Sequence, residues 1–393
     1  MLYQKNWARA WLGLGLVWFL GAIALAPSNK IYQQGLVLFL WLPTLVLAWS
    51  ARAVLVQAWK RQPALWMSVL LLLAWSGLSL AWSPAEDSGR EIKRLLYILV
   101  FLLAFPLLAQ LGLAKVRQLL LLGSGLLAIA ALVSIVNFYG LQGKSLLARL
   151  AGIGEISHPI LGAYVIGSAV LFLLYEPPQR RGLQLLWLVA LACLGAFAML
   201  SQSRGALLAL VLTVTMAPLW FRDRHSQVFS ILAVIATGLA VSAMYDLIAM
   251  RGSSFRPEIF HAVVDMIAAH PWTGLGLGLG AGYDVTAVGR HFDHTHNMFT
   301  HVAVEMGLPG MLLWVLVWLF TLGEIIRVRG TLFGKILLSF WVYSTLAMQF
   351  DAASLTGTPR AEWFISWLPV GLAMMLPWGR AENDACGKIS GST

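Results

Sequence analysis

The chain has 393 residues, of which 59% are hydrophobic and 11% are charged, and its mean hydropathy is +0.78. This composition excludes the soluble globular classes and leaves the integral membrane class. The net charge of +10 would suggest a nucleic-acid partner in a soluble protein. In a membrane protein positive charge fixes orientation instead, so we expect no nucleic-acid partner.

Apolar runs of membrane-spanning length recur along almost the whole chain. A helix of about 17 to 25 residues is long enough to cross a hydrocarbon core about 30 Å thick. Hydropathy predicts spans at residues 8–26, 34–50, 64–82, 95–112, 118–138, 158–175, 185–201, 206–221, 227–245, 309–326, 336–350 and 362–378. We therefore expect an all-α, polytopic membrane protein with about twelve transmembrane helices, in which residues 1–393 form a single domain.

The first span and the cysteines each raise an alternative. The span follows Lys5 and Arg9 and ends in an Ala-Leu-Ala sequence at 24–26 that resembles a signal-peptide cleavage site. Because the run has the length of a full span and further spans follow, we expect a transmembrane helix rather than a signal peptide. Cys193 and Cys386 lie in unrelated contexts, so we expect neither a structural disulfide nor cysteine chemistry.

Basic residues are distributed unevenly between the two sides of these spans. If the N-terminus is cytoplasmic, the inner segments hold 16 of the 27 basic residues and five acids, whereas the outer segments hold 11 basic and 12 acidic residues. The positive-inside rule then predicts that both termini are cytoplasmic. The outer loops are short except for residues 83–94, 139–157, 351–361 and the long loop at 245–308.

The loop at 245–308 carries too many functional side chains for a simple connector. It contains six of the eight histidines and three arginines, Arg251, Arg256 and Arg290. Its first part, residues 255–269, is predicted to form an amphipathic helix ended by Pro271. The alternating glycines at 274–282, Gly276 among them, permit close approach of the backbone to a ligand or to a neighbouring helix.

Two arginines are candidates for binding a phosphate group. Arg204 stands in a polar break, Ser-Gln-Ser-Arg-Gly at 201–205, where a guanidinium is costly unless it faces water or an anion. Arg256 begins the loop helix, where its planar fork and the helix N-terminal amides favour a pyrophosphate. The alternatives are a snorkelling turn residue at 204 and a surface salt bridge from Arg256 to Glu258 or Asp265.

Histidines are dense between residues 294 and 301, just before the chain re-enters the membrane. Histidine can take and return a proton near neutral pH, so one of them is a natural general base for a hydroxyl nucleophile. His294 and His296 share a face only in an extended segment, and the step from His296 to His301 does not match the i, i+4 spacing of zinc-binding helices. A metal site is therefore the minor alternative, as is a purely polar, interfacial role.

The outer loop at 83–94 mixes charges of both signs closely. This pattern favours the solvated, salt-bridged end of a helix. The alternative is that Arg90 or Lys93 binds a phosphate or a lipid headgroup, and we keep Arg90 as a candidate substrate-binding residue.

These segments occur in an order that resembles the O-antigen ligase and polymerase superfamily of bacterial envelope enzymes. The similar motifs are Ser-Arg-Gly-Ala at 203–206, the Arg256 helix leading to His-Pro-Trp-Thr-Gly-Leu-Gly at 270–276, and His296-Asn297 followed by Glu-Met-Gly-Leu-Pro-Gly at 305–310. The remainder of the chain is similar in hydropathy and number of spans. With one dominant outer loop and no added C-terminal domain, the chain is more like a ligase than a polymerase.

The resemblance implies a C-type glycosyltransferase in the bacterial inner membrane, with the loop at 245–308 and the active site facing the periplasm. It implies transfer of a glycan from undecaprenyl pyrophosphate to a sugar hydroxyl of lipid A-core, without a cofactor or a metal. Both substrates, like the membrane lipids around the spans, would be partners within the bilayer.

The resemblance also assigns roles by position. Arg204 and Arg256 would hold the pyrophosphate and stabilise it as it leaves, and His296 would be the base on the acceptor hydroxyl. His294 would assist, and Asn297, Gly276 and Arg90 complete the expected substrate-binding set.

Three alternatives remain open. O-antigen polymerases and protein O-oligosaccharyltransferases share the arginine and histidine motifs. A carrier of lipid-linked sugars would need ionisable residues at mid-depth in its spans, and the apolar runs contain almost none.

Overall fold

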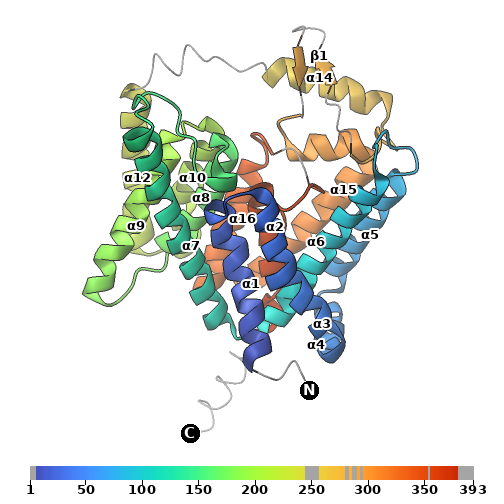
Figure 1. The fold of residues 1–393 in the computed structure, drawn as a ribbon, viewed down its shortest axis with the longest axis horizontal. Helices are drawn as coiled ribbons and strands as arrows, with labels where there is room; N and C mark the ends of the chain where they lie inside the picture. Colours follow the sequence, from blue (N-terminus) through green and yellow to red (C-terminus); the bar gives the residue numbers. More distant parts are fainter. Residues whose placement is uncertain are drawn as a thin grey trace.

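The computed structural model describes residues 6–243, 256–278, 283–285, 290–292, 295–352 and 355–378. These residues are helical apart from turns, connections and one short antiparallel pair, β1 (Tyr283–Val285) with β2 (Arg290–Phe292). The prediction of an all-α fold is confirmed in outline, and the strand pair was not anticipated. Figure 1 shows the helices as one bundle, with α14 (Arg256–Ala269) and β1 at one end and α3 (Leu42–Ser50) and α4 (Arg52–Arg61) at the other.

The remaining helices follow in chain order. They are α1 (Asn6–Leu25), α2 (Asn29–Leu36), the π-helical turn η2 (Val37–Trp41), α5 (Pro63–Ser79), α6 (Ser88–Ala109), α7 (Leu113–Ile135), the π-helical η3 (Val136–Leu141), the 3₁₀ turn η4 (Gly154–Ile156), α8 (Pro159–Leu174), α9 (Arg181–Leu200), α10 (Arg204–Met216), α11 (Pro218–Phe221), α12 (Arg224–Ala243), α15 (Met298–Arg327), α16 (Leu332–Ala347), α17 (Glu362–Ile365) and α18 (Trp367–Met374).

Seven helical stretches of the described residues are long and apolar enough to cross a membrane, and eight if α4 and α5, which meet at 101°, form one broken span. The chain is therefore a multi-pass membrane protein. Each of the twelve predicted segments overlaps a helix. However, α8, α16 and the segment Trp367–Trp378 are shorter than a full span, and α12 is not among the seven stretches, so the number of twelve stays a prediction.

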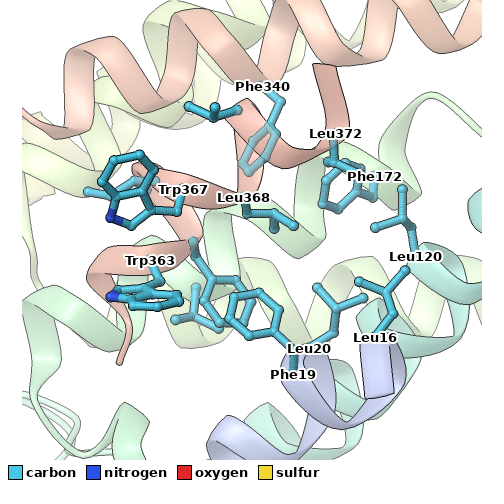
Figure 2. Packing of buried hydrophobic residues seen from close by; sticks show 14 of the residues in the cluster. Leu16, Phe19, Leu20, Leu120, Phe172, Phe340, Trp363, Trp367, Leu368 and Leu372 are labelled. Carbon is cyan, nitrogen blue, oxygen red and sulfur yellow. The ribbon is translucent and has the colours of Figure 1, made fainter. Parts of the chain in front are cut away.

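The short apolar helices form the centre of the bundle. Every residue of α18 is buried, as is α8 from Gly162 to Leu174. Figure 2 shows Trp367 and Leu368 of α18 in the same cluster as Phe172 of α8 and Phe340 of α16. A helix that is apolar on all sides is stable when neighbours cover it completely, whereas only 17% of the span window of α9 is buried in the protein. We infer that α9 faces lipid and that α18 does not.

The helix predicted at 255–269 is confirmed as α14. Its buried face, Ile259 and Val263, packs against Val304 of α15. The loop helix therefore lies against the end of the bundle. Helix α4 lies at the opposite end of the bundle and carries three basic residues, Arg52, Lys60 and Arg61. The charge asymmetry predicts such a separation of the basic end from the loop helix.

Helix α15 starts well before the predicted span at 309–326. It begins at Met298 and is interrupted at Gly307, whose φ of 68° and ψ of −177° are not helical. A Cβ at this position would also lie 2.6 Å from the carbonyl carbon of Trp272. Glycine is thus required here, and it lets the segment Met298–Met306 lie against the loop while the rest of α15 continues into the bundle.

Candidate active site

The polar break predicted before residue 206 is the junction of α9 and α10. Gln202 adopts a left-handed conformation with φ of 49°, Ser203 is the N-cap of α10, and Arg204 is the first residue of that helix. The turn reverses the chain and directs the N-terminus of α10 toward the end of the bundle that carries α14. A helix N-terminus favours anions because its first amides have no partner within the helix.

A cavity of about 430 Å³ lies at this junction. Its lining contains three arginines and an acid–histidine pair, together with five other residues: Arg149, Arg204, Arg256, His296 and Asp351, then Ile160, Gln202, Ser203, Gly205 and Phe350. The structure thus brings Arg204, Arg256 and His296 together from segments far apart in the sequence. A cluster of three guanidinium groups around one cavity is suited to a ligand with several negative charges.

Asp351 positions the imidazole of His296. The Nδ1 atom of His296 contacts Oδ1 of Asp351, and the backbone N–H of Asp351 donates to the carbonyl of His296 at 2.8 Å. The Asp351 side chain is 8% exposed and that of His296 is 26% exposed. With Nδ1 engaged by the carboxylate, proton transfer to a ligand in the cavity falls to Nε2.

Arg256 is linked to the same carboxylate. Its Nη2 lies 3.8 Å from Oδ2 of Asp351, and its Cζ lies 5.7 Å from the ring centroid of Phe350. Among the described residues this ion pair takes the place of the salt bridge to Glu258 or Asp265 considered above. Asp351 therefore holds both the candidate base and one candidate anion-binding group.

The comparisons with known proteins match the segment that carries these residues. The family described as O-antigen ligase matches residues 188–315, which include Arg204, Arg256 and His296. The O-antigen ligase of Pseudomonas aeruginosa (strain PAO1) is 31% identical over 327 residues, covering 79% of this chain and 77% of that protein. The chain belongs to the O-antigen ligase family. The resemblance drawn from the motifs is thereby confirmed, and the family membership makes this chain a transferase.

Two lining residues of this O-antigen ligase family member were missed in the sequence. Arg149 donates from Nε to the carbonyl of Ser201 at 2.8 Å, which places it beside the turn before Arg204. Arg149 and Asp351 belong to the outer loops predicted at 139–157 and 351–361. These loops are longer than a simple connection, and all outer loops meet on one side of the membrane. The length of these loops was therefore the signal in the sequence, but loop length does not indicate which side chains face one another.

Two predicted substrate-binding residues, Asn297 and Gly276, have local structural roles outside the cavity lining. Asn297 caps α15 by accepting from the amides of Phe299 and Thr300, and its Nδ2 donates to Gln349. Gly276 has a φ of 96°, and a Cβ there would lie 2.3 Å from Cα of Ser83. A substrate contact by either residue stays a prediction.

Arg90 and His294 are the other predicted members of the substrate-binding set. Arg90 is 59% exposed at the start of α6, with Nε 3.4 Å from the carboxylate of Asp87, as expected for a solvated, salt-bridged helix end. It is absent from the described cavity lining, so its role in binding stays a prediction. His294 lies outside the described residues.

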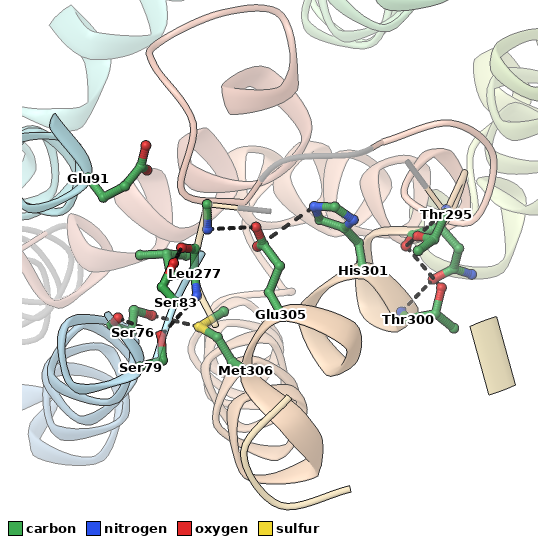
Figure 3. A network of polar contacts seen from close by, with 12 residues as sticks. Ser76, Ser79, Ser83, Glu91, Leu277, Thr295, Thr300, His301, Glu305 and Met306 are labelled. Atoms are coloured by element: carbon green, nitrogen blue, oxygen red, sulfur yellow. Dashed lines mark hydrogen bonds and ion pairs between the residues drawn. The ribbon is translucent and has the colours of Figure 1, made fainter. Parts of the chain in front are cut away.

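A second polar network anchors the glycine-rich segment (Figure 3). Oε1 of Glu305 accepts from the amide of Gly278 at 3.0 Å, and Oε2 lies 3.7 Å from Nε2 of His301. The amide of Leu277 donates to Ser79 of α5 at 3.3 Å, and its carbonyl accepts from Ser83. In the described part of this segment, the glycines allow close approach to α15 and to the connection between α5 and α6. The network supports the loop that carries α14.

We expect Gly205→Ala to impair glycan transfer. A Cβ at 205 would lie 2.5 Å from Cβ of Phe350, so either α10 or Phe350 must move. Phe350 precedes Asp351 and its ring lies beside Arg256, so the displacement reaches the site directly. The matched control is Gly195→Ala in α9, where a Cβ would meet nothing within 4 Å. Lipopolysaccharide gels at equal protein levels measure the effect, and equal O-antigen ladders from the two variants would refute it.

Proposed function

We propose that this chain ligates O-antigen to lipid A-core: it transfers the glycan from undecaprenyl pyrophosphate to a sugar hydroxyl of the acceptor. The observation that carries the proposal is the convergence of Arg204, Arg256 and the His296–Asp351 pair on one cavity. An anion-binding cluster beside an oriented imidazole supplies the two functions that displacement of a pyrophosphate by a hydroxyl requires.

The arginines would act on the leaving group. As the bond between the anomeric carbon and the pyrophosphate oxygen breaks, its electron pair stays on that oxygen and negative charge grows on the phosphate. Arg204 and Arg256, with Arg149 beside them, would neutralise this charge. Fixed positive groups stabilise developing charge strongly in a partly dehydrated site, since they need no reorganisation during the reaction.

His296 would act on the acceptor. Its Nε2 would take the proton of the sugar hydroxyl while the hydroxyl oxygen forms the new bond to the anomeric carbon. The imidazolium that results would be stabilised by the carboxylate of Asp351, which contacts Nδ1. The proton then passes to solvent after the glycan and undecaprenyl pyrophosphate separate.

The position of the cavity fits a reaction at a membrane surface. Arg256 begins α14, so the cavity belongs to the end of the bundle where α14 lies. With the basic end cytoplasmic, both termini would be cytoplasmic and the active site would face the periplasm of the inner membrane. Confining donor and acceptor to one bilayer raises their effective concentration.

Deletion of the gene tests the proposal. We expect a lipopolysaccharide gel to lose the entire O-antigen ladder while lipid A-core remains and lipid-linked glycan accumulates. Transfer in membranes treated with a chelator should continue, since the proposed chemistry uses no metal. A single repeat left on lipid A-core would indicate a polymerase instead, loss of protein glycosylation alone a protein O-oligosaccharyltransferase, and an unchanged ladder would contradict the proposal.

A further inference from the structure

Ser203 occupies the N-cap position of α10 but makes no capping hydrogen bond with its side chain. A serine at the N-cap ordinarily accepts a hydrogen bond from an amide in the first turn. Ser203 has the extended conformation of an N-cap, with φ of −84° and ψ of 94°, but its side chain makes no capping hydrogen bond. Thr331 and Asn297, by contrast, cap α16 and α15 with their side chains.

The Ser203 hydroxyl is also buried without a partner. The residue is 2% exposed, and Oγ has no hydrogen-bond partner among the described residues. A buried hydroxyl that bonds to nothing costs free energy relative to one that is satisfied. The natural explanation is a partner that arrives with the substrate, because Ser203 lines the cavity.

The surroundings of Ser203 define the charge of that partner. The cavity carries Arg149, Arg204 and Arg256. Within α10 the first bond back to the cap runs from the amide of Leu207 to the carbonyl of Ser203, so the amides of the first turn have no helical acceptor of their own. All these groups favour an anion, and a serine facing an anion acts as a hydrogen-bond donor.

The turn before α10 holds Ser203 in this position. The backbone N–H of Ser203 donates to Oγ of Ser201 at 3.3 Å. The carbonyl of Ser201 in turn accepts from Nε of Arg149. The serine, the arginine of the neighbouring loop and the helix N-terminus are therefore parts of one local structure.

We propose that Ser203 is a further substrate-binding residue: its Oγ–H donates a hydrogen bond to a phosphoryl oxygen of the lipid pyrophosphate, beside the first-turn amides of α10. This inference rests on the proposed function, because it takes the pyrophosphate donor as the ligand of the cavity. It adds a neutral hydrogen-bond donor to the arginines. It also explains why the buried serine at the N-cap position makes no capping hydrogen bond.

The test compares ligand affinity with stability in the full-length, detergent-purified protein. Farnesyl pyrophosphate is the probe, with inorganic pyrophosphate in a parallel arm, and calorimetry measures both affinities. We expect Ser203→Ala to weaken both by about 10- to 100-fold, the range for a hydrogen bond to a charged group, and Ser203→Thr to recover part of the loss. An effect on farnesyl pyrophosphate alone would overturn the proposal, because a contact to phosphoryl oxygens does not depend on the lipid.

The control is Ser168→Ala in α8, which is equally buried but whose Oγ donates to the carbonyl of Tyr164. It should leave both affinities unchanged. Without ligand, Ser203→Ala should not lower Tm, since the hydroxyl it removes has no partner to lose. A fall in Tm together with the affinity would assign Ser203 a merely structural role and overturn the proposal.

The outcome also separates this inference from the proposed function. If Ser203→Ala binds both probes as wild type does while Arg204→Ala does not, the serine contact is refuted and the donor site stands. If Arg204→Ala and Arg256→Ala also bind and transfer normally, the proposed function fails with it.

Discussion

His296→Ala is expected to lower the rate of glycan transfer by about 10²- to 10⁴-fold, the usual contribution of a general base. Without the imidazole, the acceptor hydroxyl must lose its proton to water during attack. Binding of the donor should change little, because the arginines remain. The rate is measured in membranes supplied with lipid-linked glycan, at matched protein levels.

His261→Ala is the matched control for this variant. His261 lies on α14 in the same loop, is exposed, and does not line the cavity. The control should transfer at the wild-type rate. Full activity of His296→Ala would eliminate His296 as the base and direct attention to His294, two residues earlier in the chain.

We expect Asp351 to contribute to the rate of transfer through its contact with His296. Asp351→Asn keeps the size of the side chain but removes the charge that faces the imidazole and Arg256. We expect a loss of rate smaller than that of His296→Ala. In the double variant the losses should not add, because the carboxylate acts on the proton through the histidine. Full additivity of the two losses would separate Asp351 from the base.

Arg204→Ala and Arg256→Ala are also expected to reduce the rate of glycan transfer strongly. Each removes a positive group from the leaving pyrophosphate, and we expect each to reduce transfer by about 10²- to 10³-fold, as loss of one charge-stabilising donor does elsewhere. Donor affinity should fall as well, which distinguishes these variants from His296→Ala. Calorimetry with farnesyl pyrophosphate measures the affinity, and the membrane assay measures the rate.

The lysine variants test whether geometry matters beyond charge. Arg204→Lys and Arg256→Lys keep the positive charge but lose the planar, bidentate fork, so we expect only partial recovery. Arg360→Ala is the control, since Arg360 is 56% exposed, lies 3.9 Å from Glu155 and does not line the cavity. Wild-type donor affinity in both alanine variants would rule out pyrophosphate binding by these arginines.

The parts of the site that could be predicted were those with a local anomaly in the sequence. Arg204 interrupts an apolar run, Arg256 begins an amphipathic helix, and His296 stands in a run of histidines. Asp351 gives no such signal, because an acid directly after an apolar span is an ordinary way for a span to end. Its role arises from the fold, which brings the end of α16 against the start of α15: the amide of Met298 donates to the carbonyl of Met348.

Hydropathy predicted where helices lie better than it predicted which of them span the bilayer. Lipid and protein interior are both apolar, so the lipid-facing α9 and the buried α18 read alike in the sequence. The start of α15 was missed for a related reason. Its first turns carry polar residues that pack on the loop. Gly307 with Pro309 does mark a boundary, because the backbone leaves the helical conformation at Gly307, but the chain is helical on both sides of it.

An experimental structure of the protein with undecaprenyl pyrophosphate bound would show directly whether Arg204, Arg256 and His296 act together on this donor. We expect the phosphoryl oxygens within hydrogen-bonding distance of the guanidinium groups of Arg204 and Arg256, with Nε2 of His296 facing the side from which the acceptor approaches. A pyrophosphate bound away from this cavity, or one that leaves His296 without access to the acceptor, would contradict the account.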